Sequence, residues 1–211
     1  KEMAMRKKIC IALMAAFTVL LGVSSYFIID HYREAEHQEQ MYDSLVQLVE
    51  DSETEPAEPI IYSEDKTILP ELTELYRQNN DLVGWICVED TNINYPVMQS
   101  KDNPNFYLKH GFDKAYTDYG CPYVQENCDM ELPSDNIIIY GHHMNDGSMF
   151  NVISDTTDQA TFDSMEYVYY ITRDATYKLR PLATKVVEDT YAKARTTNFE
   201  GDDGLKNYLS E

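Results

Sequence analysis

The architecture follows from residues Asn136–Phe150, NIIIYGHHMNDGSMF. Three consecutive isoleucines and a tyrosine form an apolar run that favours a buried strand, because β-branched and aromatic side chains pack well on a sheet. Gly141 and the later Asn-Asp-Gly cluster are typical of turns, so the strand should end near the two histidines. A histidine at the end of a rigid strand is well placed to transfer protons to a ligand. Successive strand side chains point to opposite faces, so His142 and His143 should diverge.

Similar short apolar or alternating runs, separated by turn residues, occur on both sides of this segment. Their texture is that of a small barrel or sandwich. Leu69–Asn79 predicts a helix before them, since it has a proline in its first turn and leucines at helical spacing. Asp202–Ser210 predicts a short final helix. We therefore expect a mainly β domain with N-terminal helices and strands within Val83–Val88, Asn94–Gln99, Cys121–Gln125, Ile137–Tyr140, Tyr167–Thr172 and Tyr177–Val187.

The charge distribution excludes one class of partner and indicates another. Seventeen Lys and Arg against thirty-seven Asp and Glu give a net charge of −20, which argues against nucleic acid because phosphate binding needs a cationic surface. Ile9–Ile29 carries no charge and is long enough for a helix that crosses a membrane, which needs about 20 apolar residues. The basic residues before this span and Asp30 after it predict that residues 1–8 lie in the cytoplasm and that the residues after the span lie outside the cell. The alternative is a cleaved signal peptide, whose apolar core is usually shorter.

The domain organisation expected from these features has four parts. They are a cytoplasmic N-terminus at 1–8, a transmembrane anchor at 9–29, an extracellular helix and acidic linker at 30–68, and a domain at 69–211. His31–Glu50 predicts a helix with a narrow apolar stripe, and Asp51–Pro59 is acidic with two prolines, which favours a flexible linker. The chain opens on Lys1, so Met3 or Met5 could be the true start.

The cysteines and histidines do not form a metal-binding pattern. Cys10 lies in the apolar span, and Cys121 and Cys128 could pair in an oxidising exterior, although their spacing leaves this open. A CxxC or HxxxH motif is absent, and adjacent histidines would chelate a metal poorly. We therefore expect neither a metal nor another cofactor, which also argues against a zinc hydrolase.

Three segments in this order resemble the class B sortases, membrane-anchored cysteine transpeptidases of Gram-positive bacteria. They are DLVGWICVEDTNINYPVMQ at 81–99, KDNPNFYL at 101–108 and IYGHHMNDGSMF at 139–150. Each segment alone is weak, whereas their order is highly specific. The resemblance covers roughly residues 69–211 and implies a sortase-like β-barrel after a single membrane anchor.

The resemblance also implies a reaction. Such enzymes cleave an NPxTx-like sorting signal near the C-terminus of a secreted protein and hold the acyl fragment as a thioester on a cysteine. They then pass this fragment to an amine of the peptidoglycan precursor. The chemistry needs a thiolate, an imidazole that exchanges protons, and a cation for the oxyanion.

The residues of the YGHHM motif can be assigned from the same resemblance. The first histidine of the motif is the catalytic one, which is His142 here, and His143 is expected to be structural. Tyr140, Asn103 and Leu108 match segments that border the substrate. Their alternatives are a core tyrosine, a turn-capping asparagine and a core leucine, and Asp146 is expected to serve the turn.

The sequence departs from the family after the histidine. The family nucleophile lies in a downstream TLxTC strand, followed by an arginine on the next strand, but the 69 residues after His142 hold neither TLxTC nor any cysteine. Arg173, Arg180 and Arg195 precede the place of the family arginine. We expect a chain cut short before the last two barrel strands, inactive as it stands. The alternative is a non-catalytic, membrane-tethered peptide-binding pseudo-sortase, and the DNA beyond the codon for Glu211 would distinguish the two.

Overall fold

The computed structural model describes residues 2–52, 57–63, 66–132, 134–201 and 203–210. The chain divides into two compact units, Lys1–Asp43 and Ser44–Glu211. The linker predicted at Asp51–Pro59 falls partly on residues 53–56, which lie outside the described residues, and residues 57–60 have no regular secondary structure.

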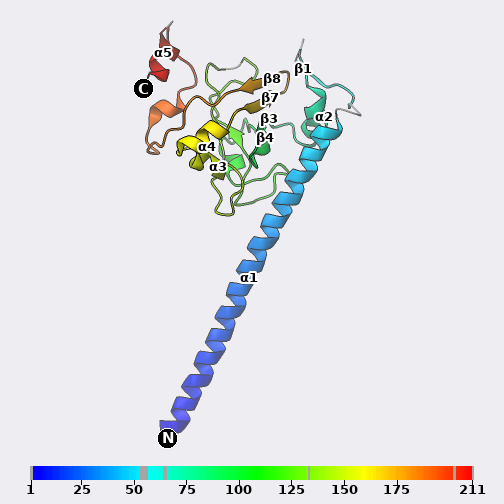
Figure 1. Ribbon diagram of the computed structural model, residues 1–211. Coiled ribbons are helices and arrows are strands. Elements are labelled where there is room, and N and C mark those ends of the chain that lie inside the picture. The colour runs from blue at the N-terminus through cyan, green and yellow to red at the C-terminus, as the bar shows by residue number, and fades with distance from the viewer. Residues whose placement is uncertain (1, 53–56, 64–65, 133, 202, 211) are drawn as a thin grey trace. The chain divides into compact units, whose positions relative to one another are not determined.

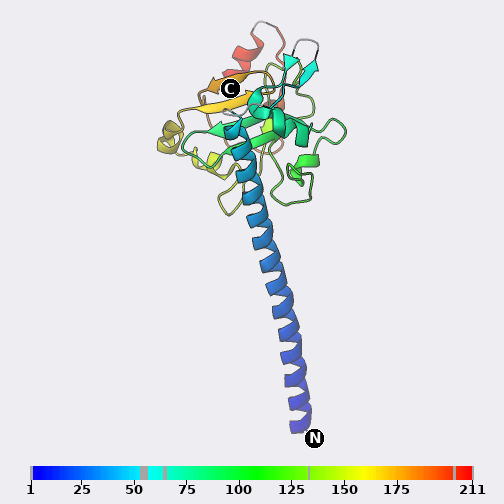
Figure 2. The same ribbon diagram turned by 90° about the vertical axis from the view of Figure 1, so that its right-hand side faces the viewer.

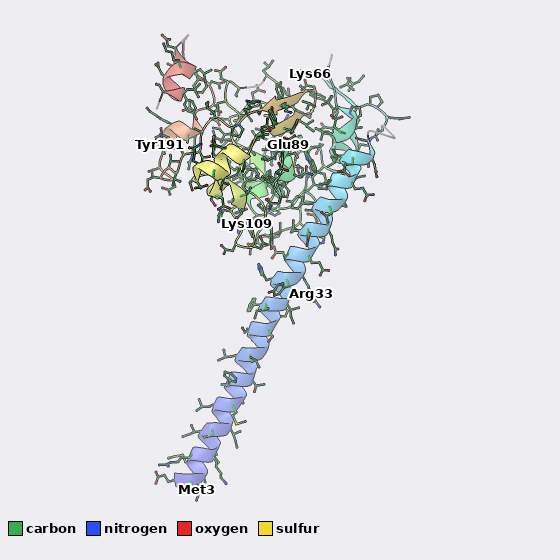
Figure 3. The ribbon with its side chains drawn as sticks, in the orientation of Figure 1. Met3, Arg33, Lys66, Glu89, Lys109 and Tyr191 are labelled. Atoms are coloured by element: carbon green, nitrogen blue, oxygen red, sulfur yellow. The ribbon has the colours of Figure 1, made fainter. Side chains whose placement is uncertain are left out.

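The described residues of the first unit lie within helix α1 (Glu2–Asp51), which Figures 1 and 2 show without a break. The helices predicted at 9–29 and 31–50 are therefore continuous, because the chain has no proline or glycine between Val23 and Asp51 to end the first. Figure 3 shows side chains projecting from α1 between Met3 and Arg33, and those of 9–29 are exposed. By length and composition, α1 is able to cross a membrane.

The second unit is built on a six-stranded sheet with the order β6-β5-β4-β3-β7-β8. Neighbouring strands are antiparallel, except for the parallel pair β4 and β5. A separate two-stranded sheet pairs β1 (Ile61–Ser63) with β2 (Lys66–Thr67). The six strands are β3 (Leu82–Val88), β4 (Asn94–Met98), β5 (Tyr123–Val124), β6 (Ile139–Tyr140), β7 (Val168–Thr172) and β8 (Thr176–Leu179).

Each predicted strand segment contains a strand, but several predictions were too long. The segment predicted at Tyr177–Val187 is extended only as far as Leu179. Pro181 explains this end, since proline has no N–H to donate to a sheet ladder. The side chains of β8 are exposed, as expected for an edge strand.

The sheet is open rather than a closed barrel. In the part of the chain that the structure describes, β6 and β8 are the two edges and do not pair with each other. The expectation of a mainly β, sortase-like fold is met in this coarser form, with α1 at its N-terminus.

Helix α2 (Pro70–Gln78) contacts strand β3 and contributes buried side chains to the core. The helix begins with Pro70 as predicted and buries Leu72 and Leu75. Trp85 on β3 is 2% exposed, and its Nε1 donates a hydrogen bond to Asn94 Oδ1 at 2.6 Å. This bond satisfies the one polar atom of the indole, so the ring can be buried without cost to hydrogen bonding.

Six short elements were not predicted from the sequence. They are the strands β1 and β2 and the helices η1 (Phe106–Leu108), α3 (Asn151–Asp155), α4 (Gln159–Ser164) and η2 (Ala192–Arg195). The carboxylate of Asp158 caps α4 by accepting hydrogen bonds from Ala160 N and Thr161 N. These elements are too short for an apolar period to reveal them. The helix predicted at the C-terminus is present as α5 (Gly204–Leu209).

Candidate functional site

The loop after β6 folds back over the end of that strand. Phe150 N donates to the carbonyl of His142 at 2.8 Å, and His143 pairs with Met149 in an isolated bridge. Gly141 lies against the Phe150 ring, where a Cβ atom would overlap the ring carbons. The strand ends at Tyr140, directly before Gly141 and the two histidines as predicted, and the turn follows at residues 145–147.

The half-buried His142 ring is oriented by a backbone carbonyl. His142 Nε2 lies 2.7 Å from the carbonyl oxygen of Leu108, its only hydrogen-bond partner among the described residues. A carbonyl only accepts, so Nε2 carries the proton and donates it to this bond. In the neutral imidazole, Nδ1 is then the nitrogen that is able to accept a proton.

The Leu108 carbonyl is held by two segments, residues 106–109 and 116–121, which we call the histidine support. Thr117 N donates to Lys109 O at 3.0 Å, and Cys121 N donates to Tyr107 O at 2.9 Å. Gly120 adopts a positive φ of 60° at their closest approach. A Cβ atom there would lie 2.6 Å from Tyr107 O, 2.7 Å from Leu108 O and 3.1 Å from His142 Cδ2. Glycine at this position therefore permits the contact between the support and the histidine.

A buried hydrogen-bond network anchors the support to the core. Tyr107 is 1% exposed, and its hydroxyl accepts from Asn79 Nδ2 at 2.9 Å and donates to Asp81 Oδ2 at 2.8 Å. Asn79 Nδ2 also donates to Phe112 O at 2.6 Å. Burial raises the pKa of Tyr107 well above its ordinary value, so the hydroxyl remains a donor at any physiological pH.

A carboxylate lies within electrostatic reach of the His142 ring. Lys109 Nζ approaches Asp118 Oδ1 to 2.8 Å, joining the two segments of the support. The hydrogen bond from Lys109 lowers the pKa of Asp118, with a smaller contribution from the charge of His142. Asp118 is therefore a fixed negative charge beside the histidine.

The predicted site residues separate into those that reach His142 and those that do not. Leu108 reaches it through its carbonyl, with a side chain 39% exposed. The Tyr140 hydroxyl donates to Gln125 Oε1, and its ring stacks at a tilt 5.3 Å from the Tyr123 ring. The exposed Asn103 is engaged through its backbone only, since its N–H bonds Ser100 Oγ and its carbonyl accepts from Phe106 N.

The second histidine and the loop aspartate take different partners. His143 Nε2 lies 3.1 Å from Asn151 Nδ2, so the two histidines diverge as predicted. Asp146 accepts from Ser148 N at 2.9 Å and from the Tyr119 hydroxyl at 2.6 Å, which places it in the turn and against the histidine support. The sequence did not identify Gly120, Lys109 or Asp118 as part of the site. Their neighbours along the chain do not indicate that they lie near His142, which is more than twenty positions away.

The two buried thiols nearest to His142 in the sequence have backbone carbonyls as hydrogen-bond partners. Cys121 Sγ donates to Pro96 O at 3.6 Å and Cys128 Sγ to Asn136 O at 3.7 Å, so the disulfide left open by the sequence is not formed. Burial raises the pKa of Cys128 and of Cys87, which keeps both thiols protonated and poorly nucleophilic. None of the described cysteines hydrogen-bonds His142. The described residues also contain no group of three or more His, Cys, Asp or Glu suited to a metal ion.

Comparison with known proteins identifies relatives of one kind. The chain is 26% identical to sortase B of Staphylococcus aureus over 195 residues, which span 92% of this chain and 75% of that protein. It is 44% identical to sortase B of Listeria monocytogenes over 80 residues, or 38% of this chain and 32% of that protein. No protein-family model matches the chain.

Solved structures of the same kind share the fold. Sortase B from Bacillus anthracis in complex with AAEK1 superposes with a TM-score of 0.66 and 26% identity, covering 85% of this chain and 79% of that one. The Staphylococcus aureus sortase B–substrate complex superposes with a TM-score of 0.68 and covers 86% and 78%; at 23% identity it supports the fold alone. The resemblance inferred from the sequence is therefore confirmed.

Proposed function

We propose that this chain, a homologue of the class B sortases, contributes the proton-transferring histidine of a sorting reaction. The class B sortases are cysteine transpeptidases that anchor proteins to the cell wall. The proposed substrate of this chain is a secreted protein with an NPxTx-like C-terminal sorting signal, and its acceptor is an amine of the peptidoglycan precursor. The observation that carries the proposal is the placement of His142 at the end of β6, oriented by Leu108 O at 2.7 Å.

The geometry supports a proton-transfer role for His142. The bond from Nε2 to Leu108 O fixes the ring and leaves Nδ1 to exchange the proton. As an imidazolium, the ring donates this proton to the leaving amine; as a neutral base, it accepts one from the incoming amine. Asp118, held by Lys109 at 2.8 Å, keeps a negative charge in the segment that supports the ring.

The groove for the sorting signal is proposed to lie along the residues around this histidine. Tyr140 and Leu108 are proposed to contact the peptide, Tyr140 from two positions before His142 and Leu108 from the histidine support. Asn103 is proposed as a more distant contact, since its side chain is exposed and its backbone starts the turn into η1.

The nucleophile is proposed to come from a strand that these 211 residues do not contain. All four cysteines precede His142 in the sequence. The outer edge of β6 is unpaired within the described residues, and Ile137, Ile138 and Ile139 beside it are only partly buried. A TLxTC strand added at this edge would bring a thiol toward the histidine. As it stands, the 211-residue polypeptide is proposed not to form an acyl-enzyme.

A non-catalytic role is the second candidate. It is favoured by the absence of a thiol contact to His142 among the described residues, together with a sortase-like fold. In this role the domain binds a sorting peptide at the membrane without cleaving it.

The membrane arrangement is a further part of the proposal. Residues 9–29 of α1 form the anchor, residues 1–8 lie in the cytoplasm, and residues 30–68 connect the anchor to an extracellular domain at 69–211. The length and apolar composition of α1, and the basic residues that precede the span, support this topology.

The proposed function is tested with the 211-residue chain in nonionic detergent and a fluorogenic NPxTx peptide. We expect saturable binding, followed by fluorescence anisotropy, and no cleavage. Tyr140→Ala should weaken binding, whereas Tyr177→Ala on the exposed edge strand β8 should not. A thiol-dependent cleavage rate would contradict the absence of a nucleophile, and a failure to bind any sorting peptide would contradict both candidate functions.

A further inference from the structure

The second unit contains a cavity that His142 does not line. Its volume is about 1000 Å³, at the upper end of the range for small-molecule sites. It is formed at the start of β3, by the loop after β4 and by the segment around residues 126–131. The cavity is open to solvent and its lining is mainly polar, so it suits a charged or hydrogen-bonding ligand.

Arg173 is a buried cation in this cavity. It lies in the turn between β7 and β8, is 9% exposed, and places its guanidinium carbon 4.5 Å from the centre of the Tyr62 ring. No hydrogen-bond acceptor or carboxylate contacts its side chain among the described residues. None of its nitrogens is among the described buried polar atoms without a partner, so the guanidinium keeps contact with the solvent of the cavity. The face of one aromatic ring leaves its hydrogen-bond donors available to a ligand.

The other charges near Arg173 are already engaged. The adjacent Asp174 bonds Lys66 Nζ at 2.9 Å and accepts from the Thr172 hydroxyl. The two lysines of the cavity also have carboxylate partners: Lys114 lies 3.0 Å from Asp81, and Lys101 lies 3.5 Å from Glu131. Within the described lining, Arg173 is thus the cation without a carboxylate.

Three exposed carboxylates of the cavity lack a cationic partner among the described residues, and one of them, Asp129, already accepts hydrogen bonds from Glu131 N and Leu132 N. The other two, Asp102 and Glu126, make no ion pair with any described residue. The cavity therefore combines an unpaired buried cation with unpaired carboxylates that face solvent. A simple polyanion such as a phosphate ester would be attracted by the first and repelled by the second.

We propose that this cavity binds a peptide-like zwitterion, whose carboxylate pairs with Arg173 and whose ammonium group is held by Asp102 and Glu126. The planar guanidinium donates two parallel hydrogen bonds to a carboxylate, which suits the buried end of the site. The volume accommodates a short peptide rather than only a free amino acid. The proposal does not depend on the transpeptidase assignment, since Arg173, Asp102 and Glu126 have no part in the proton transfer proposed for His142. Asn103, proposed above as a distant peptide contact, also lines the cavity.

The test uses the full 211-residue chain in nonionic detergent, labelled with ¹⁵N at arginine. The Nε–H resonance of Arg173 is followed by NMR while triglycine is added, and Arg180, which is exposed and outside the cavity, serves as the internal control. We expect a saturable shift for Arg173 alone. Triglycinamide, which lacks the carboxylate, should give none, and N-acetyltriglycine, which lacks the ammonium group, should bind about fivefold more weakly.

Two variants complete the test. Arg173→Lys keeps the charge but cannot donate two parallel hydrogen bonds to a carboxylate, so it should weaken triglycine binding by about tenfold. The double variant Asp102→Asn, Glu126→Gln changes only exposed side chains, so it should fold normally and bind triglycine no better than it binds N-acetyltriglycine. Absence of a shift with triglycine, equal binding of triglycinamide, or saturation by inorganic phosphate and not by triglycine would each overturn the proposal.

Discussion

His142 Nε2 and the carbonyl oxygen of Leu108 are 2.7 Å apart, although the two residues belong to different segments of the second unit. Leu108 ends the short helix η1, and His142 follows the end of β6. His142 is the motif histidine that the resemblance assigns to catalysis. Its partner in this contact is a backbone atom whose position is fixed by Tyr107 and Gly120. The orientation of the ring is therefore a property of the fold rather than of a bound substrate.

The tautomer of His142 follows directly from this contact. Because a carbonyl only accepts, the neutral ring should carry its proton on Nε2 and leave Nδ1 unprotonated. ¹⁵N NMR of the chain at a pH where the ring is neutral should show this pattern for His142. A proton on Nδ1 would contradict the hydrogen bond.

Replacing Gly120 with alanine should damage both stability and the site. The new Cβ would lie 2.6 Å from Tyr107 O and 2.7 Å from Leu108 O, at a φ of 60°. We expect a loss of about 2 kcal/mol or more in the free energy of unfolding, and displacement of Leu108 from His142. Urea unfolding can be followed by the fluorescence of Trp85, the single tryptophan, which is 2% exposed.

Gly147→Ala is the matched control for this substitution. Gly147 also has a positive φ, of 87°, but no atom lies within 4 Å of its added Cβ. Its cost should be limited to backbone strain of about 1 kcal/mol. Equal losses for the two variants would show that the contact with the histidine support does not matter.

Tyr107→Phe should weaken the attachment of the histidine support to the core. The change removes the hydroxyl that accepts from the buried Asn79 and donates to the half-buried Asp81, so each of these groups loses one hydrogen bond. We expect a loss of about 1–3 kcal/mol and a changed chemical shift at His142. Tyr116→Phe removes an exposed hydroxyl 3.3 Å from Asp118 and should change stability by less than about 0.5 kcal/mol.

The ion pair between Lys109 and Asp118 should be visible in a pH titration. The folded-state pKa of Asp118 is depressed by Lys109, so its contribution to stability is present above the unfolded pKa of about 3.9 and is lost as the pH falls through the folded value. Carboxyl ¹³C NMR should give Asp118 a pKa below that of an ordinary aspartate.

Charge-removing variants identify the cause of that shift. In Lys109→Gln the pKa of Asp118 should return toward its ordinary value, while in Lys101→Gln, which pairs with Glu131 elsewhere, it should stay low. A pKa of Asp118 that stays equally low in Lys109→Gln would be inconsistent with the 2.8 Å contact.

The sequence predicted those parts of the fold that local physics determines. The β-branched run of Ile137–Tyr140, the Asn-Asp-Gly turn at 145–147 and the proline at the start of α2 each specify a structure within a few residues. Strand lengths were overestimated, because the alternation of apolar residues continues past Leu179 although Pro181 cannot join a ladder.

Only the part of the site that belongs to a sequence motif could be predicted. His142 was identified from the YGHHM segment, but its partner is a backbone carbonyl, which leaves no trace in the sequence. Gly120 and Asp118 act through contacts that the tertiary fold creates, and so does Arg173, whose burial depends on the turn between β7 and β8. None of these roles follows from the neighbours of the residue along the chain.

The central claim is that His142, rather than its neighbour His143, transfers protons in a sortase-type reaction. The most direct measurement joins the chain to the TLxTC and arginine strands of the Staphylococcus aureus relative and follows cleavage of an NPxTx peptide. Thiol-dependent cleavage should appear, fall by about 10²-fold or more in His142→Ala, and persist in His143→Ala. Cleavage that survives the loss of His142, or that depends equally on His143, would contradict the account.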